Sequence, residues 1–289
     1  MIEFLYENFA DDTNFPIHIQ YGFHDDDLYT HSHKDFSELV IVLDGKADHV
    51  VNGENYPISR GDVFVINHST EHGFSVPERL KICNIMFRPE EAFSDTYDIK
   101  QLAGFQALFV LEPHYSRNYG FCSQLKLNSA EYSETESVID CIMNEYTNKL
   151  SGWKDMVFYG FRRLCTMLSR FYRTEKAKSE NDFFKLADAV AYIENNFCNQ
   201  ITLESLARIS GYSERQFLRI FRSAFSTTPN LYISVLRTKK AEHLLETTNL
   251  SIGEVAYRCG FTDHNYFSRF FRKTTGLSPS EYRSALNRR

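Results

Sequence analysis

Residues 201–289 contain the same pattern twice. Its shared positions are Leu206-Ala207 with Val255-Ala256, Gly211-Tyr212 with Gly260-Phe261, Phe217 with Phe267, and Pro229-x-x-Tyr232 with Pro279-x-x-Tyr282. The offset is 49 residues as far as Tyr212, which follows the turn glycine, and 50 from Phe217 onward. Each copy has a short amphipathic helix, a glycine turn and a second amphipathic helix, which is the pattern of a helix-turn-helix. Two such units in one chain predict a sequence-specific DNA-binding protein.

The first copy predicts a supporting helix over residues 203–209, a turn at Gly211, and a recognition helix that ends near Ala224. Its apolar side chains recur at helical spacing, at Phe217, Ile220, Phe221 and Ala224. The cap and the opposite face are therefore expected to contact DNA through Ser213, Arg215, Leu218, Arg219 and Arg222. Arg215 and Arg219 lie one turn apart, and arginine to guanine is the commonest specific contact in the major groove.

The second copy predicts a recognition helix over residues 263–273, behind a supporting helix that carries Val255 and Ala256. Phe267, Phe270 and Phe271 are expected to face inward. The DNA-contacting face then presents His264, Asn265, Ser268, Arg269 and Arg272. Asn265 is suited to adenine, and the arginines are suited to guanine or phosphate. The outward residues of the two copies differ, so one chain is expected to read an asymmetric site in two parts.

Residues 229–246 predict a helix that joins the two copies. Fifteen helical residues of this segment span about 22 Å. We expect it to hold the recognition helices about one DNA turn apart, roughly 34 Å, in successive major grooves. The alternative, that both copies are ordinary amphipathic helices, does not account for outward arginines at matching places.

Charge divides the chain into two regions. Residues 1–174 hold 15 Lys and Arg against 26 Asp and Glu, a net charge of −11, whereas residues 175–289 hold 17 against 12, a net charge of +5. The basic region is the one that contains the repeats, as attraction to phosphate requires. A length of 289 residues is enough for two domains.

The N-terminal region has a strand-rich pattern. Between residues 17 and 87, apolar and β-branched stretches alternate with turn dipeptides, which predicts a small barrel or sandwich. The dipeptides Asp44-Gly45 and Arg60-Gly61 predict turns, and Asn52-Gly53 predicts a hairpin. Ser133-x-x-Glu136 predicts the start of a helix, and residues 153–172 predict another. The two helices can cover the barrel or form a dimer interface.

The predicted fold class is therefore α+β with two domains: an N-terminal β-barrel with a helical dimerisation segment, and a C-terminal all-α domain with two helix-turn-helix motifs. The expected boundaries are residues 1–128 for the barrel with an N-terminal arm, 129–173 for the dimerisation helices, 174–181 for a polar linker, and 182–289 for the DNA-binding domain. The six scattered cysteines and the absence of a long apolar run indicate a soluble cytoplasmic protein, without membrane contact.

The stretch SIGEVAYRCGFTDHNYFSRFFRKTTGLSPSEYR, residues 251–283, closely resembles the C-terminal signature of the AraC/XylS family of bacterial transcription regulators. The resemblance covers about 100 residues and implies binding to double-stranded DNA at promoter half-sites and, usually, activation of transcription. It also implies that the acidic residues Glu254 and Asp263 lie where such activators touch the sigma subunit of RNA polymerase. Asp263 has an alternative role as a helix cap. Ser226 departs from the family, in which many members have glycine.

The N-terminal region contains a partial cupin motif, His31-Ser32-His33 followed by Glu38, with His72 in the second part. Alternate residues of a strand point to one face, so these side chains can converge. As the cupin resemblance implies, they would be metal ligands in an enzyme, whereas in related regulators the same positions line an effector pocket. Three further alternatives to the effector pocket remain open: buried structural polar groups, metal-assisted effector binding, and a true metallo-enzyme. The fusion to a DNA-binding domain favours the effector pocket.

The stretch HSHKDFSELVIVLDGKADHVVNGENYPISRGDVFVINHSTEH resembles the sensor domain of the L-rhamnose-operon regulators of this family. That resemblance implies a sugar effector, with L-rhamnose as the first candidate. We therefore expect a homodimeric, effector-responsive activator of sugar-utilisation genes that is not an enzyme and carries no cofactor. The alternative is a metal-binding cupin sensor, or a metallo-cupin enzyme, fused to a DNA-binding domain.

Overall fold

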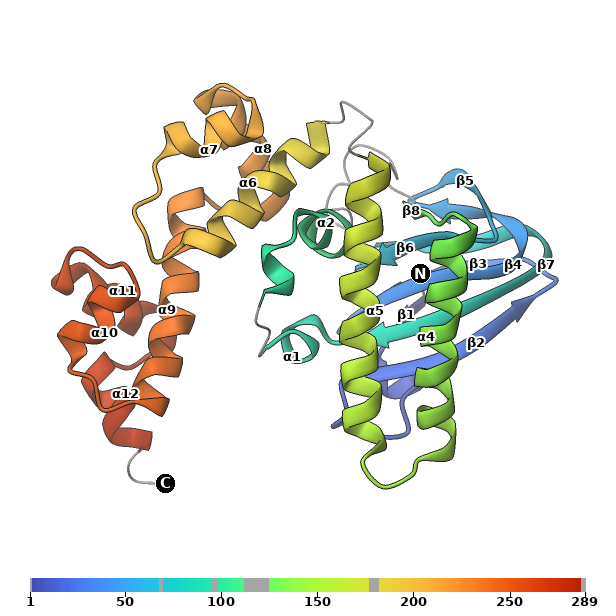
Figure 1. The fold of residues 1–289 in the computed structure, drawn as a ribbon, viewed down its shortest axis with the longest axis horizontal. Helices are drawn as coiled ribbons and strands as arrows, with labels where there is room; N and C mark the ends of the chain where they lie inside the picture. Colours follow the sequence, from blue (N-terminus) through green and yellow to red (C-terminus); the bar gives the residue numbers. More distant parts are fainter. Residues whose placement is uncertain (1, 68–69, 95–97, 112–124, 177–181, 287–289) are drawn as a thin grey trace. The chain divides into compact units, whose positions relative to one another are not determined.

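The computed structural model describes residues 2–67, 70–94, 98–111, 125–176 and 182–286. The chain divides into two units, residues 1–184 and 185–289. The first is built on a β-sheet and the second is entirely helical where it is described (Figure 1). The α+β class with two domains, expected from the sequence, is confirmed.

The sheet of the first unit has eight strands. They are β1 (Ile2–Phe4), β2 (Ile17–His24), β3 (Leu28–His33), β4 (Ser37–Val51), β5 (Glu54–Ser59), β6 (Asp62–Ile66), β7 (His72–Phe87) and β8 (Leu125–Lys126). The hydrogen-bonded order is β1-β3-β7-β4-β6-β8, with β2 beside β7 and β5 beside β4. Among the described strands β8 does not pair with β1, so the sheet is open. Its edge strands, of three and two residues, are too short to close a barrel.

The hairpin at Asn52-Gly53 is confirmed. Both residues have positive φ, 50° and 85°, as a two-residue type I′ turn requires. The turn joins β4 to β5, and the pairing runs from Val51 opposite Glu54 to Lys46 opposite Ser59. The Arg60-Gly61 dipeptide likewise separates β5 from β6, with Gly61 at a φ of 89°.

The turn predicted at Asp44-Gly45 is wrong, because β4 continues through it. The register of β4 against β7 shifts between Val42 and Asp44 and again before Lys46. Gly45 has a φ of 75°, and a Cβ there would lie 2.2 Å from the carbonyl oxygen of Arg79. The glycine therefore allows an irregularity inside a long strand, where the neighbouring backbone comes too close for a side chain.

Two long helices, α4 (Ser129–Asn148) and α5 (Trp153–Lys176), run side by side across one face of the sheet (Figure 1). The Tyr132 hydroxyl of α4 donates to the Leu43 carbonyl (3.0 Å), and the Phe161 ring of α5 lies 5.1 Å from that of Phe87. These contacts show that α4 and α5 cover the sheet, which is one of the two roles that the sequence left open for them. On the other side of α5, Met156 and Tyr159 are exposed.

The start predicted for α4 at Ser133 is wrong. The helix begins four residues earlier, where the Asn128 side chain accepts from the backbone N–H groups of Ala130 and Glu131, both at 3.0 Å. The Glu131 carboxylate accepts from the N–H of Asn128 in return (3.0 Å). An Asn-x-x-Glu box upstream therefore takes the place of the Ser-x-x-Glu pair, whose glutamate instead accepts from the Tyr132 hydroxyl.

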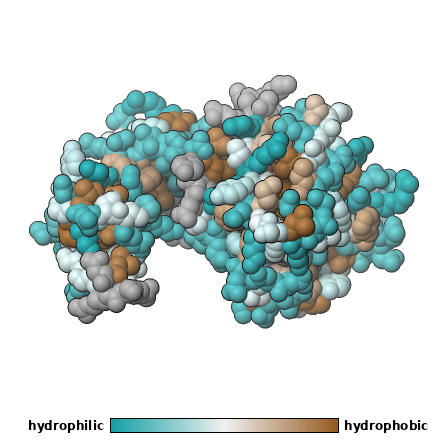
Figure 2. Space-filling model, turned by 60° about the horizontal axis from the view of Figure 1, so that its bottom comes forward, coloured by the Kyte–Doolittle hydropathy of each residue, from teal (hydrophilic) through white to brown (hydrophobic). Residues whose placement is uncertain are grey.

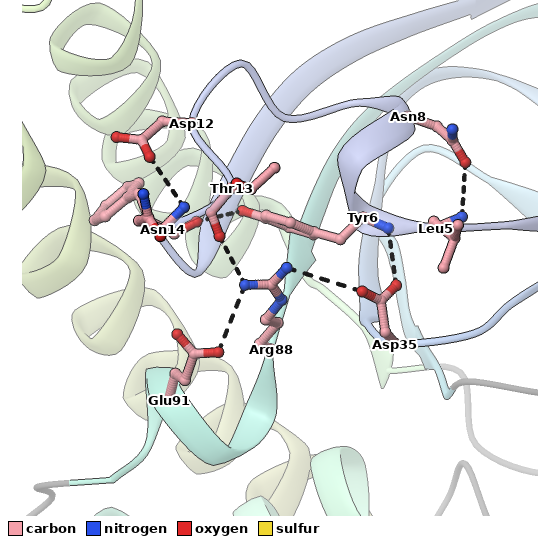
Figure 3. A network of polar contacts seen from close by, with 10 residues as sticks. Leu5, Tyr6, Asn8, Asp12, Thr13, Asn14, Asp35, Arg88 and Glu91 are labelled. Atoms are coloured by element: carbon pink, nitrogen blue, oxygen red, sulfur yellow. Dashed lines mark hydrogen bonds and ion pairs between the residues drawn. The ribbon is translucent and has the colours of Figure 1, made fainter.

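The segment before β2 is held to the sheet by polar contacts around Tyr6 and Arg88 (Figure 3). The N–H of Tyr6 donates to the Asp35 carboxylate (2.8 Å), and its hydroxyl donates to the Phe15 carbonyl (2.8 Å). Arg88 donates to the Thr13 carbonyl at 2.7 Å, and its guanidinium lies over the Tyr6 ring. The N-terminal segment is thereby fixed where β1 pairs in parallel with β3.

Short helical turns complete the first unit, at η1 (Tyr6–Asn8), α1 (Pro89–Ala92), η2 (Ile99–Gln101), α2 (Ala103–Phe105) and η3 (Gln106–Leu111). The linker proposed over residues 174–181 is only partly visible. Helix α5 continues to Lys176, and residues 177–181 lie outside the described residues. The linker therefore stays a prediction.

The second unit consists of seven helices in the described residues. They are α6 (Asp182–Asn196), α7 (Leu203–Ser210), α8 (Glu214–Phe225), α9 (Pro229–Thr247), α10 (Ile252–Arg258), α11 (His264–Thr275) and α12 (Pro279–Leu286). Around the second copy of the repeat, the buried core gathers Ala241 and Leu245 of α9 with Val255, Phe267 and Phe271. Helix α9 therefore belongs to this core as well as joining the two copies.

Helices α8 and α11 end in the same left-handed conformation, at Ser226 with a φ of 52° and at Gly276 with a φ of 82°. The departure from glycine at Ser226 has thus not changed the geometry. A left-handed residue with a Cβ costs about 1 to 2 kcal/mol, which glycine avoids. We expect Ser226→Gly to raise the free energy of unfolding of the second unit by about 1 kcal/mol in chemical denaturation. Ser226→Ala, which keeps the Cβ, should give no gain, and equal effects of the two changes would contradict this explanation.

Hydrophilic residues predominate on the face shown in Figure 2, where hydrophobic residues form small separate groups. Within the described part of the chain, no helix combines the length and the apolar character that crossing a membrane requires.

Candidate DNA-reading faces and effector site

The first copy folds as a helix-turn-helix of α7 and α8. Gly211 follows α7 with a φ of 65°, and the Ser213 hydroxyl caps α8 by accepting from the N–H of Gln216. The buried residues of α8 are those predicted: Phe217, Ile220, Phe221 and Ala224. Of the predicted DNA-contacting residues, Ser213, Arg215, Arg219 and Arg222 are exposed and Leu218 is half-buried. The three arginines are therefore exposed together on the face of α8 opposite its buried residues.

The second copy folds in the same way from α10 and α11. The Asp263 carboxylate caps α11 by accepting from the N–H of Tyr266 (2.9 Å), so its alternative role as a cap is present. Phe267 and Phe271 are buried, and Phe270 is half-buried against Tyr266. The predicted reading residues His264, Asn265, Arg269 and Arg272 are exposed and Ser268 is half-buried.

The one-residue slip between the copies lies in the turn. Ser213 caps α8 two residues after Gly211, whereas Asp263 caps α11 three residues after Gly260, because Thr262 is inserted. The same backbone bond nevertheless closes both turns, from Tyr212 to Ala207 (3.1 Å) and from Phe261 to Ala256 (3.0 Å). The slip therefore changes the loop before the recognition helix and leaves the end of the supporting helix unchanged.

Helix α9 contacts both helix-turn-helix units, through α8 on one side and through α10 and α11 on the other. It has 19 residues, a length of about 28 Å. The Arg237 guanidinium fixes its middle by donating to the carbonyl oxygens of Phe197 (2.6 Å) and Asn199 (2.8 Å), in the loop between α6 and α7. The sequence pattern did not identify this role of Arg237.

The two acidic residues predicted near the polymerase are both exposed and both cap helices. The Glu254 carboxylate accepts from the N–H of Ser251 (2.8 Å) at the start of α10. The Ser251 hydroxyl (2.7 Å) and this N–H lower the pKa of Glu254, and the N–H groups of Tyr266 and Asn265 lower the pKa of Asp263. Both carboxylates therefore carry a negative charge on the outside of the second unit.

In the sheet unit, the four predicted effector residues come together. His31 and His33 lie on β3, Glu38 on β4 and His72 on β7, with His31 directly opposite His72. The Nε2 atoms of His33 and His72 are 3.2 Å apart. The Glu38 Oε2 atom lies 3.6 Å from Nε2 of His72 and 4.0 Å from Nε2 of His33. One ligand nitrogen from each of the three histidines lies within 4.8 Å of the others.

Burial controls the charge of this cluster. His31 is 6% exposed, Glu38 4%, and His33 and His72 1% each. Removal from water raises the pKa of Glu38 to about 8 and lowers the pKa of His33 to about 3. It also lowers the pKa of His72, which the neighbouring histidines lower further. At neutral pH each of these histidines is therefore uncharged, with one protonated ring nitrogen and one that can accept a hydrogen bond, and Glu38 is mostly protonated.

Aromatic residues surround the cluster. The Phe36 ring stacks on His33 with centroids 4.3 Å apart, and Phe4 of β1 meets the edge of His31 at 5.0 Å. A further buried histidine, His49 of β4, stacks on Phe64 and lies 5.7 Å from His72. Neither β1 nor His49 was identified from the sequence. Strand alternation could have identified His49, because it lies two residues before Val51 and therefore on the same face of β4. Val51 is the β4 residue opposite His72.

Comparison with known proteins matches each of the two units to a domain family. A helix-turn-helix domain model matches residues 206–285, and an AraC-like ligand binding domain model matches residues 17–149. The HTH-type transcriptional activator RhaS of Enterobacter sp. is 30% identical over 87% of this chain and 86% of its own length. The RhaS activator of Salmonella arizonae is 31% identical over the same shares. The chain belongs to the AraC family.

This AraC-family regulator thus combines a ligand-binding sheet unit, which contains the histidine cluster, with a DNA-binding helical unit, which contains both candidate reading faces. The DNA-binding domain of AdpA, solved in complex with a target DNA, is 36% identical over 36% of this chain and 94% of that one, with a TM-score of 0.35. The two RhaS relatives reported above are transcriptional activators.

Proposed function

We propose that this regulator activates transcription of sugar-utilisation genes when a sugar binds its N-terminal unit, with L-rhamnose as the first candidate. The two exposed reading faces carry this proposal, because they occur in a chain whose other half matches a ligand-binding model. The RhaS relatives are transcriptional activators, which supports activation rather than repression. The proposed site of action is the cytoplasm, where promoter DNA is accessible.

The proposed DNA contacts are Ser213, Arg215, Leu218, Arg219 and Arg222 in the first unit and His264, Asn265, Ser268, Arg269 and Arg272 in the second. Exposed guanidinium groups and an amide on two capped helices support this assignment. Because α9 contacts both units, we propose that one chain reads a bipartite half-site in successive major grooves of double-stranded DNA.

The proposed effector contacts are His31, His33, Glu38 and His72. Neutral imidazoles can both donate and accept hydrogen bonds, and a sugar offers many hydroxyl groups that do the same. His31 is the most exposed of the four and would be the first to meet a ligand. The surrounding rings of Phe4 and Phe36 supply the apolar surface that commonly lines a small-molecule site.

Two partners complete the proposal. Glu254 and Asp263 keep exposed negative charges beside the second unit, which suits contact with a basic surface of the polymerase sigma subunit. A homodimer through α4 and α5 would bring two chains to adjacent half-sites. The exposed Met156 and Tyr159 of α5 are apolar groups available to such an interface.

Fluorescence anisotropy with DNA from upstream of its own gene tests the proposal. We expect at least one sugar of a panel that includes L-rhamnose to strengthen binding of the full-length protein by about 5- to 150-fold, the usual range of allosteric coupling. The same DNA with its base order scrambled is the control and should show weaker binding without a sugar response. If no sugar changes the affinity for the upstream DNA, the sensor part of the proposal is wrong. Equal binding to both DNAs would contradict sequence-specific reading.

A further inference from the structure

Two cysteines of the helical unit, far apart in the sequence, come close together in the fold. Cys198 belongs to the loop between α6 and α7, and Cys259 ends α10 directly before the turn glycine Gly260. A Cβ added to Gly260 would lie 2.9 Å from the Cα atom of Cys198, so the two backbones touch. Because consecutive Cα atoms are about 3.8 Å apart, the Cα atoms of the two cysteines are separated by at most about 8 Å. A disulfide joins Cα atoms about 4.4 to 6.8 Å apart, so a small movement of the loop suffices to bridge them.

Cys198 has the surroundings of a reactive thiol. It is partly exposed, and the ammonium group of Lys240 on α9 donates to its Sγ atom at 3.2 Å. The Arg237 guanidinium holds the same loop by donating to the carbonyl oxygens on either side, those of Phe197 and Asn199. Thiols that oxidants attack are typically accessible and close to cationic groups. Cys198 is therefore the cysteine of the pair that an oxidant meets first.

Cys259 differs from Cys198 in exposure and in protonation. It is fully buried, in the apolar core of the second repeat. Burial raises the pKa of its thiol to about 12; negative charge on Cys198 raises it as well, whereas the positive charges of Lys240 and Arg237 lower it. Charges act on one another in this way only at short range, so the four groups form one cluster. Cys259 keeps its proton at neutral pH, which assigns it to the second step of an oxidation rather than to the first.

We infer that Cys198 and Cys259 form a redox-active pair, which a hydroperoxide converts into a disulfide. In the first step the Cys198 sulfur attacks the peroxide: an S–O bond forms, the O–O bond breaks, and the released oxygen takes up the thiol proton as water or an alcohol. In the second step the Cys259 sulfur attacks the Cys198 sulfur: the S–S bond forms, the S–O bond breaks, and hydroxide leaves with the Cys259 proton as water. The two thiols lose two electrons, which the hydroperoxide gains. Neither DNA nor a sugar takes part, so this inference is independent of the proposed function.

The disulfide would tie the loop before α7 to the turn before α11. It would thereby join the two helix-turn-helix units at a second place besides α9. The closed loop would run from residue 198 to residue 259, and a bridge across a long loop stabilises a fold mainly by constraining the unfolded chain. We therefore expect peroxide to raise the midpoint of thermal unfolding of the helical unit by about 5 °C or more, and dithiothreitol to reverse the shift.

Peptide mapping of the full-length, tag-free protein after treatment with hydrogen peroxide tests the pair directly. Residues 186–208 and 259–269 form separate tryptic peptides, so we expect non-reducing mass spectrometry to find them joined, and dithiothreitol to separate them. Cys198→Ser should abolish the joined peptide. Cys259→Ala should leave Cys198 as a sulfenic acid, which dimedone labels. Cys141→Ser is the matched control, because Cys141 is an exposed cysteine of α4 in the other unit, and it should not change the yield.

Lys240→Met tests the role of the ammonium group without altering either cysteine. Methionine keeps most of the aliphatic chain but removes the charge beside Cys198, so the joined peptide should form several-fold more slowly and reach the same final yield. Four results would overturn the inference: no joined peptide after peroxide, Cys198 joined in preference to another cysteine, a rate that Lys240→Met leaves unchanged, or an unfolding midpoint that oxidation does not raise.

Discussion

Gly260→Ala is expected to destabilise the second helix-turn-helix by about 2 to 5 kcal/mol, which combines a left-handed residue that has a Cβ with a steric clash. Gly260 has a φ of 88°, and a Cβ there would lie 2.3 Å from the carbonyl oxygen of Cys198. That oxygen belongs to backbone, which cannot turn aside as a flexible side chain can. Chemical denaturation of the full-length protein, followed by circular dichroism, measures the loss.

The first copy of the repeat provides the control. Gly211 occupies the equivalent turn with a φ of 65°, but no atom lies within 4 Å of the position its Cβ would take. Gly211→Ala should therefore cost only the left-handed conformation, about 1 to 2 kcal/mol. Two equal losses would show that the contact with Cys198 relaxes without cost. DNA affinity, measured well below the denaturation midpoint, should fall with Gly260→Ala because the second reading helix is no longer held.

The second large effect is on DNA binding. Arg215→Ala and Arg219→Ala are each expected to cost about 1 to 3 kcal/mol at the cognate site, a loss of about 5- to 150-fold in affinity, and to relax the base preference there. Both side chains are exposed on α8, one turn apart. Competition binding against a set of single-base variants of the site measures both quantities.

Arg208→Ala is the matched control for these substitutions. Arg208 is an exposed arginine of the supporting helix, paired with Glu204 at 3.0 Å, so its removal changes the net charge equally. It should weaken binding little and leave base preference unchanged. Losses for Arg215→Ala that are the same on random DNA would mean that this arginine contacts only phosphate.

The helical unit was the more predictable part of the chain. Its buried stripe on α8 agrees with the sequence residue by residue, because 3.6-residue periodicity and capping are local properties. The two errors in the sheet unit had different causes. The irregularity at Gly45 depends on Arg79 of another strand, and the start of α4 depended on choosing between two capping sequences.

The candidate effector site was predictable in composition but not in geometry. Strand alternation placed His31 and His33 on one face, and the pairing of β3 with β7 then brought His72 opposite His31. The 3.2 Å approach of two imidazoles and the cover supplied by Phe4 could not be read from spacing. Both depend on how distant strands align.

Helix α9 contacts both helix-turn-helix units, so its length sets the distance between α8 and α11. One residue added to an α-helix advances it by about 1.5 Å and turns it by about 100°. If α8 and α11 enter successive major grooves as proposed, such a change within α9 would move one of them out of its groove while the other stayed in place. Under that proposal, we expect the operators of such regulators to differ in their bases but not in their internal spacing, and new specificities to come from side-chain exchange on α8 and α11.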